Sequence, residues 1–161
     1  MAALGKPSLL VIGGTGFIGH HLLVATRDDY QVTSISLNPP VPQRFVADVK
    51  YVQLDIRDLN ATTPILDVDY DYVVNLGGYI EHTLFKDGGS LSIDAHFLAL
   101  QNLITALARR SLKRFVQIGS SDEYGNVPAP QCEDSREKPI SPYSFAKVAS
   151  THFLQMLHRT E

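Results

Sequence analysis

A tyrosine and a lysine near the end of the chain, Tyr143 and Lys147, have the spacing of two side chains on one face of a helix. An ammonium beside a phenol stabilises the phenolate, and a tyrosine so placed can transfer a proton while a nicotinamide ring transfers a hydride. The same spacing also occurs on solvated helix faces. Ser120 and Ser121 follow a predicted strand and favour the catalytic interpretation, because a serine hydroxyl there would polarise a carbonyl group.

Three glycines near the start, Gly13, Gly16 and Gly19, have the spacing of a turn that closes on a pyrophosphate. The first would allow the tight turn, the second a close approach of the backbone, and the third close packing of a helix against a strand. They follow an apolar run over residues 8–12 and open a predicted helix over 16–26. Because a helix N-terminus attracts phosphate, this context favours a dinucleotide site over a glycine-rich turn without a ligand.

The end of the second predicted strand lacks the carboxylate that commonly holds the adenosine ribose of NAD. Ser36 and Asn38 stand there instead and would bond a ribose hydroxyl or a 2′-phosphate, although no arginine accompanies them. The expected cofactor is therefore NAD or NADP, with NADP slightly favoured. Asp55 and Ile56, after the third predicted strand, would contact the adenine, and a helix N-cap is the alternative role for Asp55.

The rest of the chain predicts the elements that would position these residues. Strands are expected over 8–12, 31–37, 51–54, 72–76 and 114–118, and helices over 16–26, 90–110 and from 142 to the end. Proline and glycine predict loops over 38–42 and 119–142. This alternation predicts an α/β fold with a doubly wound parallel sheet, in one dinucleotide-binding domain over 1–161.

Four segments carry a resemblance to a known family: the glycine turn, Leu-Asp-Ile-Arg-Asp at 54–58, Ser-Ser-Asp-Glu-Tyr-Gly at 120–125 and Ser-Pro-Tyr-Ser-Phe-Ala-Lys at 141–147. Together they resemble the extended short-chain dehydrogenase/reductases, and among these the NAD-dependent epimerase/dehydratase family, whose members act on nucleotide sugars. The resemblance runs from Leu9 to the chain end. It implies a Rossmann-type NAD(P)-binding domain, truncated before the sugar-nucleotide region that normally follows.

The resemblance also implies a role for each matching residue. Tyr143 would be the catalytic base or acid, with Lys147 as its partner and as a ligand of the nicotinamide ribose. Ser120 or Ser121 would donate to the carbonyl, and the count back from Tyr124 favours Ser120. No metal ligands are expected. The cofactor-binding residues would be Gly13, Gly16, Phe17, Ile18, Gly19, Ser36, Asn38, Asp55, Ile56, Leu76, Gly77, Gly78, Tyr143 and Lys147.

Departures from the family pattern bear on the reaction. His96 stands where family members usually carry an asparagine near a helix start, and its apolar surroundings favour core packing over catalysis. Asp122 and Glu123 look like the acid and base of 4,6-dehydratases, but the loop is one residue shorter and more similar to 4-keto reductases; both could also be turn and solvent residues. We therefore expect hydride transfer at sugar C4 by an epimerase or 4-keto reductase, then a dehydratase, or a non-catalytic dinucleotide-binding fragment.

Composition limits the partners and the compartment. A net charge of −3 without a basic block argues against nucleic acid or an anionic membrane as the main partner. Cys132 is the single cysteine, which excludes an internal disulfide and fits a reducing compartment. No stretch approaches the ~20 apolar residues that span a bilayer, so a cytoplasmic location is expected. The family resemblance implies a nucleotide-sugar substrate and a homodimer through the helices at 90–110 and 142–160.

Overall fold

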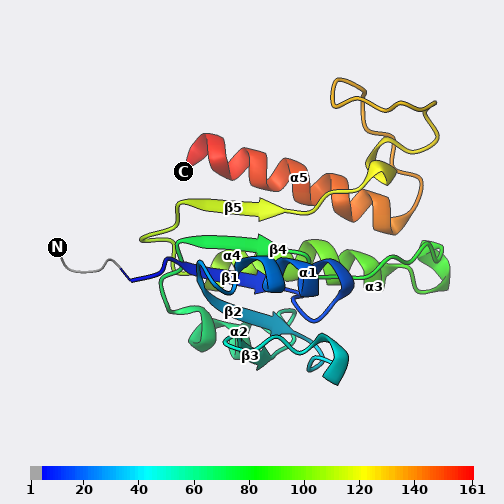
Figure 1. Cartoon of the computed structure of the whole chain (residues 1–161). Helices are drawn as coiled ribbons and strands as arrows, with labels where there is room; N and C mark the ends of the chain where they lie inside the picture. The colour runs from blue at the N-terminus through cyan, green and yellow to red at the C-terminus, as the bar shows by residue number, and fades with distance from the viewer. Residues whose placement is uncertain (1–4) are drawn as a thin grey trace. The chain divides into compact units, whose positions relative to one another are not determined.

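The computed structural model describes residues 5–161, drawn as a ribbon in Figure 1. These residues form two compact units. The first unit holds the chain up to Gly77 together with Asn102–Ile118. The second unit holds Gly78–Gln101 and Gly119–Glu161.

A parallel sheet of five strands forms the first unit, as the sequence predicts (Figure 1). Four of the strands end one residue before the predicted end, although Leu76 and Ile118 still donate backbone hydrogen bonds to Ile12 and Asn75 of the neighbouring strands. The strands are β1 (Ser8–Ile12), β2 (Gln31–Ser36), β3 (Lys50–Gln53), β4 (Tyr72–Asn75) and β5 (Arg114–Gln117).

The strand order is β3-β2-β1-β4-β5, so the chain extends the sheet first to one side of β1 and then to the other. In parallel sheets of this kind, ligands bind beyond the carboxyl ends of the strands where the direction reverses. Here that position is the end of β1, between β2 and β4, where Ile12 pairs with Ile35 and Asn75. The glycine turn begins with the next residue.

The two faces of the sheet are apolar because alternate residues of each buried strand point in opposite directions. On one face Leu9, Val11 and Val32 pack with Leu23 of α1 (Phe17–Thr26). The alternate residues Leu10, Ile35 and Val73 are fully buried as well. Burial of both faces confirms the predicted α/β class and explains the continuous apolar runs in the sequence.

One helix of the first unit, α2 (Leu59–Leu66), was not predicted. Its signal is weak because it has only eight residues, with Pro64 inside it. The Asp58 side chain accepts the Ala61 N–H and caps the helix. Asp58 is therefore the N-cap, and the alternative role considered for Asp55 is wrong.

The predicted helix over 90–110 is shorter than expected and contains an irregular turn. It consists of α3 (Ser90–Ile93), the π-helical turn η3 (Asp94–Leu98) and α4 (Ala99–Ala106). A π-helical turn holds one residue more than an α-helical turn, which sequence periodicity does not indicate. The division between the two units falls within α4, after Gln101.

The predicted final helix is α5 (Pro142–Thr160) in the second unit. It begins where expected because Ser141 caps it through the Ser144 N–H and Pro142 fits its first turn. The predicted loop over 119–142 contains a short 3-10 turn, η4 (Ser121–Tyr124). Similar turns are η1 (Pro42–Arg44) in the first unit and η2 (Phe85–Asp87) in the second. Within residues 5–161, no helix has the length and apolar character needed to cross a bilayer.

Candidate active site

The glycine turn follows β1 directly and cannot accommodate larger residues at two of its positions. Gly13 has φ of +79°, and a Cβ there would lie 3.0 Å from the carbonyl group of Leu76. A Cβ at Gly19 would overlap the carbonyl oxygen of Gly13 and lie 2.6 Å from Gly14 Cα. The turn itself is closed by the Gly16 N–H, which donates to the Gly13 carbonyl at 3.1 Å. The predicted roles of Gly13 in the turn and of Gly19 in close packing agree with this geometry.

The N-terminus of α1 is suited to an anion. Its N-cap, Gly16, provides no side-chain hydrogen bond, and the first turn contains no acidic residue. The backbone N–H groups of this turn and the helix dipole therefore favour a phosphate. Phe17 and Ile18 are exposed and stand in the first turn of α1, where their backbone N–H groups have no partner within the helix. These residues fit a pyrophosphate-binding loop.

Residues at the ends of β2 and β3 lie around the same edge of the sheet. Ser36 is buried, and its hydroxyl accepts the Thr15 N–H at 3.3 Å, which joins β2 to the glycine turn. Asn38 is exposed. Asp55 forms an ion pair with Arg57, with 2.6 Å between the closest nitrogen and oxygen, and the hydrogen bonds from Arg57 lower the pKa of Asp55. The carboxylate of Asp55 is therefore already partnered.

The end of β4 is fixed by an asparagine. The side chain of Asn75 is buried, donates to Gln117 Oε1 at 2.8 Å and accepts the Gly77 N–H at 3.0 Å. Leu76 and Gly77 thereby face the glycine turn, where Leu76 contacts Gly13. Within the first unit the structure thus brings together the predicted cofactor-binding residues of the β1 and β4 ends.

The predicted tyrosine–lysine pair lies on α5 in the second unit. Tyr143 and Lys147 are 5% and 4% exposed, and the Lys147 ammonium lies 5.7 Å from the centre of the Tyr143 ring. The shared helix face is confirmed, and the solvated-face alternative is wrong. Burial lowers the pKa of Lys147, while the negative charge of Glu123 acts in the opposite direction.

Two histidines pack edge-on against the Tyr143 ring. The His96 ring centre lies at 5.1 Å and the His82 ring centre at 5.5 Å. His96 is buried, as its apolar surroundings predict, and its Nε2 lies 2.8 Å from the Tyr79 carbonyl oxygen. Its ring fills the space that a Cβ at Gly78 would need. Gly78, predicted to line the cofactor, therefore also provides the space for the His96 ring.

The turn η4 carries the two predicted serines. The Ser120 hydroxyl accepts the Asp122 N–H at 3.2 Å, whereas Ser121 is exposed. Glu123 is buried, and its Oε1 accepts the Ser120 N–H at 2.9 Å. Its Oε2 accepts the Thr151 hydroxyl of α5 at 3.0 Å. Glu123 is thus not a solvent residue: it attaches the serine turn to the helix of the tyrosine–lysine pair.

A family model, described as the NAD dependent epimerase/dehydratase family, matches residues 9–161. The chain belongs to this family. The match includes the glycine turn, η4 and α5, and this agrees with the residues that carried the resemblance in the sequence. The family description names NAD, and the glycine turn and the bare N-terminus of α1 fit its pyrophosphate.

Relatives of this epimerase/dehydratase chain include a dTDP-glucose 4,6-dehydratase of Haemophilus influenzae, 27% identical over 95% of this chain and 52% of the relative. The UDP-N-acetylglucosamine 4-epimerase structure from Methanobrevibacter ruminantium is 26% identical over 97% of this chain and 52% of that one, with a TM-score of 0.81. MoeE5 in complex with UDP-glucose and NAD is 26% identical over 90% and 47%, with a TM-score of 0.77. The chain spans about half the length of the curated relatives it matches.

Three features of the second unit were not predicted from the sequence: the hydrogen bonds of Glu123 to Ser120 and Thr151, the packing of His82 on Tyr143, and the position of the His96 ring beside Gly78. Their contacts are long-range in sequence or depend on backbone geometry, so no local pattern indicates them. One signal was available for Glu123, since Ser120 and Glu123 have the spacing of a capping box. Within the described part of the chain, no group of three His, Cys, Asp or Glu side chains could hold a metal ion.

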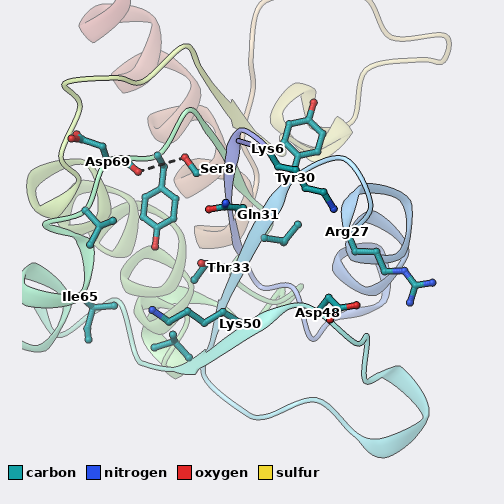
Figure 2. A pocket seen from close by; sticks show the side chains of 14 residues that line it. Lys6, Ser8, Arg27, Tyr30, Gln31, Thr33, Asp48, Lys50, Ile65 and Asp69 are labelled. Carbon is teal, nitrogen blue, oxygen red and sulfur yellow. Dashed lines mark hydrogen bonds between the residues drawn. The ribbon is translucent and has the colours of Figure 1, made fainter. Parts of the chain in front are cut away.

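A pocket of about 520 Å³ in the first unit lies elsewhere, at the amino-terminal ends of β1, β2 and β3. Its charged side chains have both signs, and Figure 2 shows Lys50 and Arg27 pointing away from one another. The strand ends that carry the glycine turn are at the opposite edge of the sheet. This pocket is therefore separate from the predicted cofactor-binding residues.

Proposed function

We propose that the whole protein is a nucleotide-sugar epimerase or 4-keto reductase that transfers a hydride at sugar C4, with Tyr143 as acid and base. The observation that carries this proposal is the buried Tyr143 beside the buried Lys147 ammonium, 5.7 Å from the ring centre. When bound, NAD supplies the hydride acceptor and donor. The Tyr143 phenolate takes the proton of the C4 hydroxyl during oxidation, and the resulting phenol returns it during reduction. Lys147 stabilises the phenolate that exists before the first step and after the second.

The serine turn would complete the site. The Ser120 hydroxyl accepts the Asp122 N–H, so its own hydrogen is left to donate to the oxygen on C4. Ser121 remains the second candidate for this role because it follows Ser120 in the same turn and is exposed. Gly13, Gly16 and Gly19 would hold the pyrophosphate at the edge of the sheet.

A 4,6-dehydratase is the second candidate, and the names of several relatives favour it. Dehydration requires a free carboxylate to act as a base. Both oxygens of Glu123 already accept hydrogen bonds, from Ser120 and Thr151, and this argues against such a role for Glu123. The half-buried Asp122 is then the carboxylate left for this chemistry in η4.

We propose NAD as the first cofactor to test and NADP as the alternative. The family description and the MoeE5 complex favour NAD. The lack of a carboxylate at the end of β2, where Ser36 and Asn38 stand, favours NADP. Fluorescence titration of this chain with NADH and with NADPH separates the two, and it needs no sugar substrate.

We also propose the homodimer and the cytoplasmic location that the sequence predicts. Exposed apolar side chains on both predicted dimer helices support the dimer, namely Leu91 and Leu98 on α3 and η3 and Phe145 and Met156 on α5. Sedimentation of Phe145→Glu against the unchanged chain tests it. A lower mass for the variant is expected. A monomer mass for the unchanged chain would contradict the dimer, and a dimer mass for both chains would contradict this interface.

The proposed catalytic role is tested by Tyr143→Phe in the full-length protein. Turnover should fall by about 10³-fold or more, because acid–base catalysis is lost, while NADH affinity stays unchanged. Tyr30→Phe in the first unit is the matched control and should keep full activity. Unchanged turnover in Tyr143→Phe would remove the proposed mechanism.

A further inference from the structure

His96 contains a buried nitrogen without a hydrogen-bond partner among the residues that the structure describes. Its Nε2 lies 2.8 Å from the Tyr79 carbonyl oxygen, which can only accept, so Nε2 carries the hydrogen. Nδ1 is then a bare acceptor in a neutral ring. An unsatisfied buried acceptor is unfavourable, and an apolar residue of similar size would avoid this cost. The nitrogen therefore requires a functional explanation.

Lys147 lies on the face of α5 that packs against His96. The backbone carbonyl of His96 accepts the Ser150 hydroxyl at 3.5 Å, and the His96 ring meets the Tyr143 ring at 5.1 Å. Tyr143, Lys147 and Ser150 occupy one face of α5, because they are spaced by four and three residues. The side chain of Lys147 therefore starts from α5 between Tyr143 and Ser150, the two residues that His96 contacts.

The His96 ring is held in place from several sides. Nε2 is bonded to the Tyr79 carbonyl, and the ring fills the space beside Gly78, whose φ is +109°. The Tyr143 ring lies against it at an angle of 79°. Nδ1 is consequently a fixed acceptor, whereas the four-carbon stem of Lys147 can rotate.

We propose that Nδ1 of His96 accepts a hydrogen bond from the Lys147 ammonium and so positions this ammonium beside the Tyr143 phenol. His96 is a positioning residue in this proposal, which rests on the proposed function only for the role of Tyr143. The bond requires a change of the Lys147 rotamer that brings the ammonium to Nδ1. When Tyr143 is protonated, its phenol has no negative charge to attract the ammonium. The hydrogen bond to the neutral Nδ1 keeps the Lys147 ammonium in place during this state.

The charged surroundings are compatible with this bond. Burial lowers the pKa of His96, and the positive charge of Lys147 lowers it further, so the ring stays neutral and keeps its acceptor. Burial lowers the pKa of Lys147 and the negative charge of Glu123 raises it, so Glu123 favours the protonated ammonium that donates to Nδ1. The carboxylate of Glu123 itself accepts hydrogen bonds from Ser120 and Thr151. His82 lies on the Tyr143 ring with its Nε2 3.6 Å from Asp122 Oδ2.

The test is a pH titration of the whole chain in which NMR follows the resonance of the Lys147 ε-carbon. This resonance is assigned by its absence in the Lys147→Met variant. His96→Asn keeps an acceptor, the amide oxygen, near the position of Nδ1. His96→Leu introduces a side chain of nearly the same shape as asparagine but without an acceptor. His96→Phe keeps a ring without nitrogen. His96→Asn should titrate like the unchanged chain, and the other two should show about a tenfold larger acid dissociation constant for Lys147. Equal titration of His96→Asn and His96→Leu would overturn the proposal.

A second measurement does not depend on the folding of any His96 variant. The ¹⁵N resonance of His96 Nδ1 should move when Lys147 loses its proton, and it should not move in Lys147→Met. A constant Nδ1 resonance through the Lys147 titration would overturn the proposal. Neither measurement needs a substrate, so both are independent of the turnover measured for Tyr143→Phe. The positioning role of His96 and the catalytic role of Tyr143 can therefore be disproved separately.

Discussion

The glycine turn of the first unit and the tyrosine–lysine pair of the second are stabilised in different ways. Around Gly13 and Gly19 the contacts are between backbone atoms, and the adjoining core is apolar. Around Tyr143 the buried groups include His96, Lys147 and Glu123. A substitution in the first region therefore acts by steric overlap, and one in the second acts through hydrogen bonds and charge.

The two parts of the proposed site should therefore respond to different changes. The glycine turn contains few titratable groups, so pH should affect it little, but a Cβ added at Gly13 or Gly19 would meet backbone atoms. A cluster of buried polar groups tolerates small changes of volume but not the loss of one partner.

The largest effect is expected for Gly19→Ala in the first unit. The added Cβ would overlap the Gly13 carbonyl oxygen, and backbone atoms cannot move aside as a flexible side chain does. We expect the free energy of unfolding to fall by about 3 kcal/mol and dinucleotide binding to be lost. Urea unfolding and NADH titration measure this. Gly5→Ala, where a Cβ meets open space, is the control and should change neither.

A smaller effect is expected for Glu123→Gln in the second unit. The amide keeps the size of the side chain but can accept only one of the two hydrogen bonds from Ser120 and Thr151. Unfolding free energy should fall by about 2 kcal/mol. The control Glu133→Gln changes an exposed carboxylate and should be neutral. A neutral Glu123→Gln would show that charge and hydrogen bonding do not determine stability in this region.

Asp58→Ala should cost about 1 kcal/mol of unfolding free energy, because it removes the N-cap of α2. Asp55→Ala breaks a partly exposed pair with Arg57 and should cost about 0.5 kcal/mol or less. Urea unfolding of both variants gives the comparison. The reverse order of the two effects would contradict the assignment of Asp58 as the cap.

The smallest effect is a difference in the pH dependence of stability between the two regions. Lys113 and Ser8 lower the pKa of Asp71 to about 2 from 3.8, so stability that is present above pH 3.8 is lost as pH falls towards 2. Burial lowers the pKa of His96 from 6.5, so below pH 6.5 the unfolded chain binds a proton that the folded one excludes, and stability again falls.

Urea unfolding at a series of pH values measures both steps. Asp71→Asn should remove the step at lower pH and leave the step that begins near 6.5. His96→Asn should do the opposite. A single step that both variants change alike would mean that the two regions do not differ in the way described here.

Local patterns were sufficient to predict the first region and only partly the second. The apolar run Leu9–Ile12 predicts a buried strand and the glycines predict the turn after it, because burial and tight turns each restrict which residue types can occur. The face shared by Tyr143 and Lys147 follows from their spacing. The contacts of His96 with Gly78 and of Glu123 with Thr151 join distant segments, and α2 is too short and too interrupted by Pro64 for its periodicity to stand out.

The π-helical turn η3 also affects which changes of chain length the protein can accept. It contains His96, and the deletion of another residue of this turn would convert it into an ordinary α-helical turn. The wide turn absorbs its extra residue locally, so the residues that follow, such as the fully buried Leu100, would keep nearly the same orientation. In a regular helix such as α5, a deletion would instead rotate every following residue by about 100°. A single-residue deletion should therefore be tolerated better in η3 than in α5.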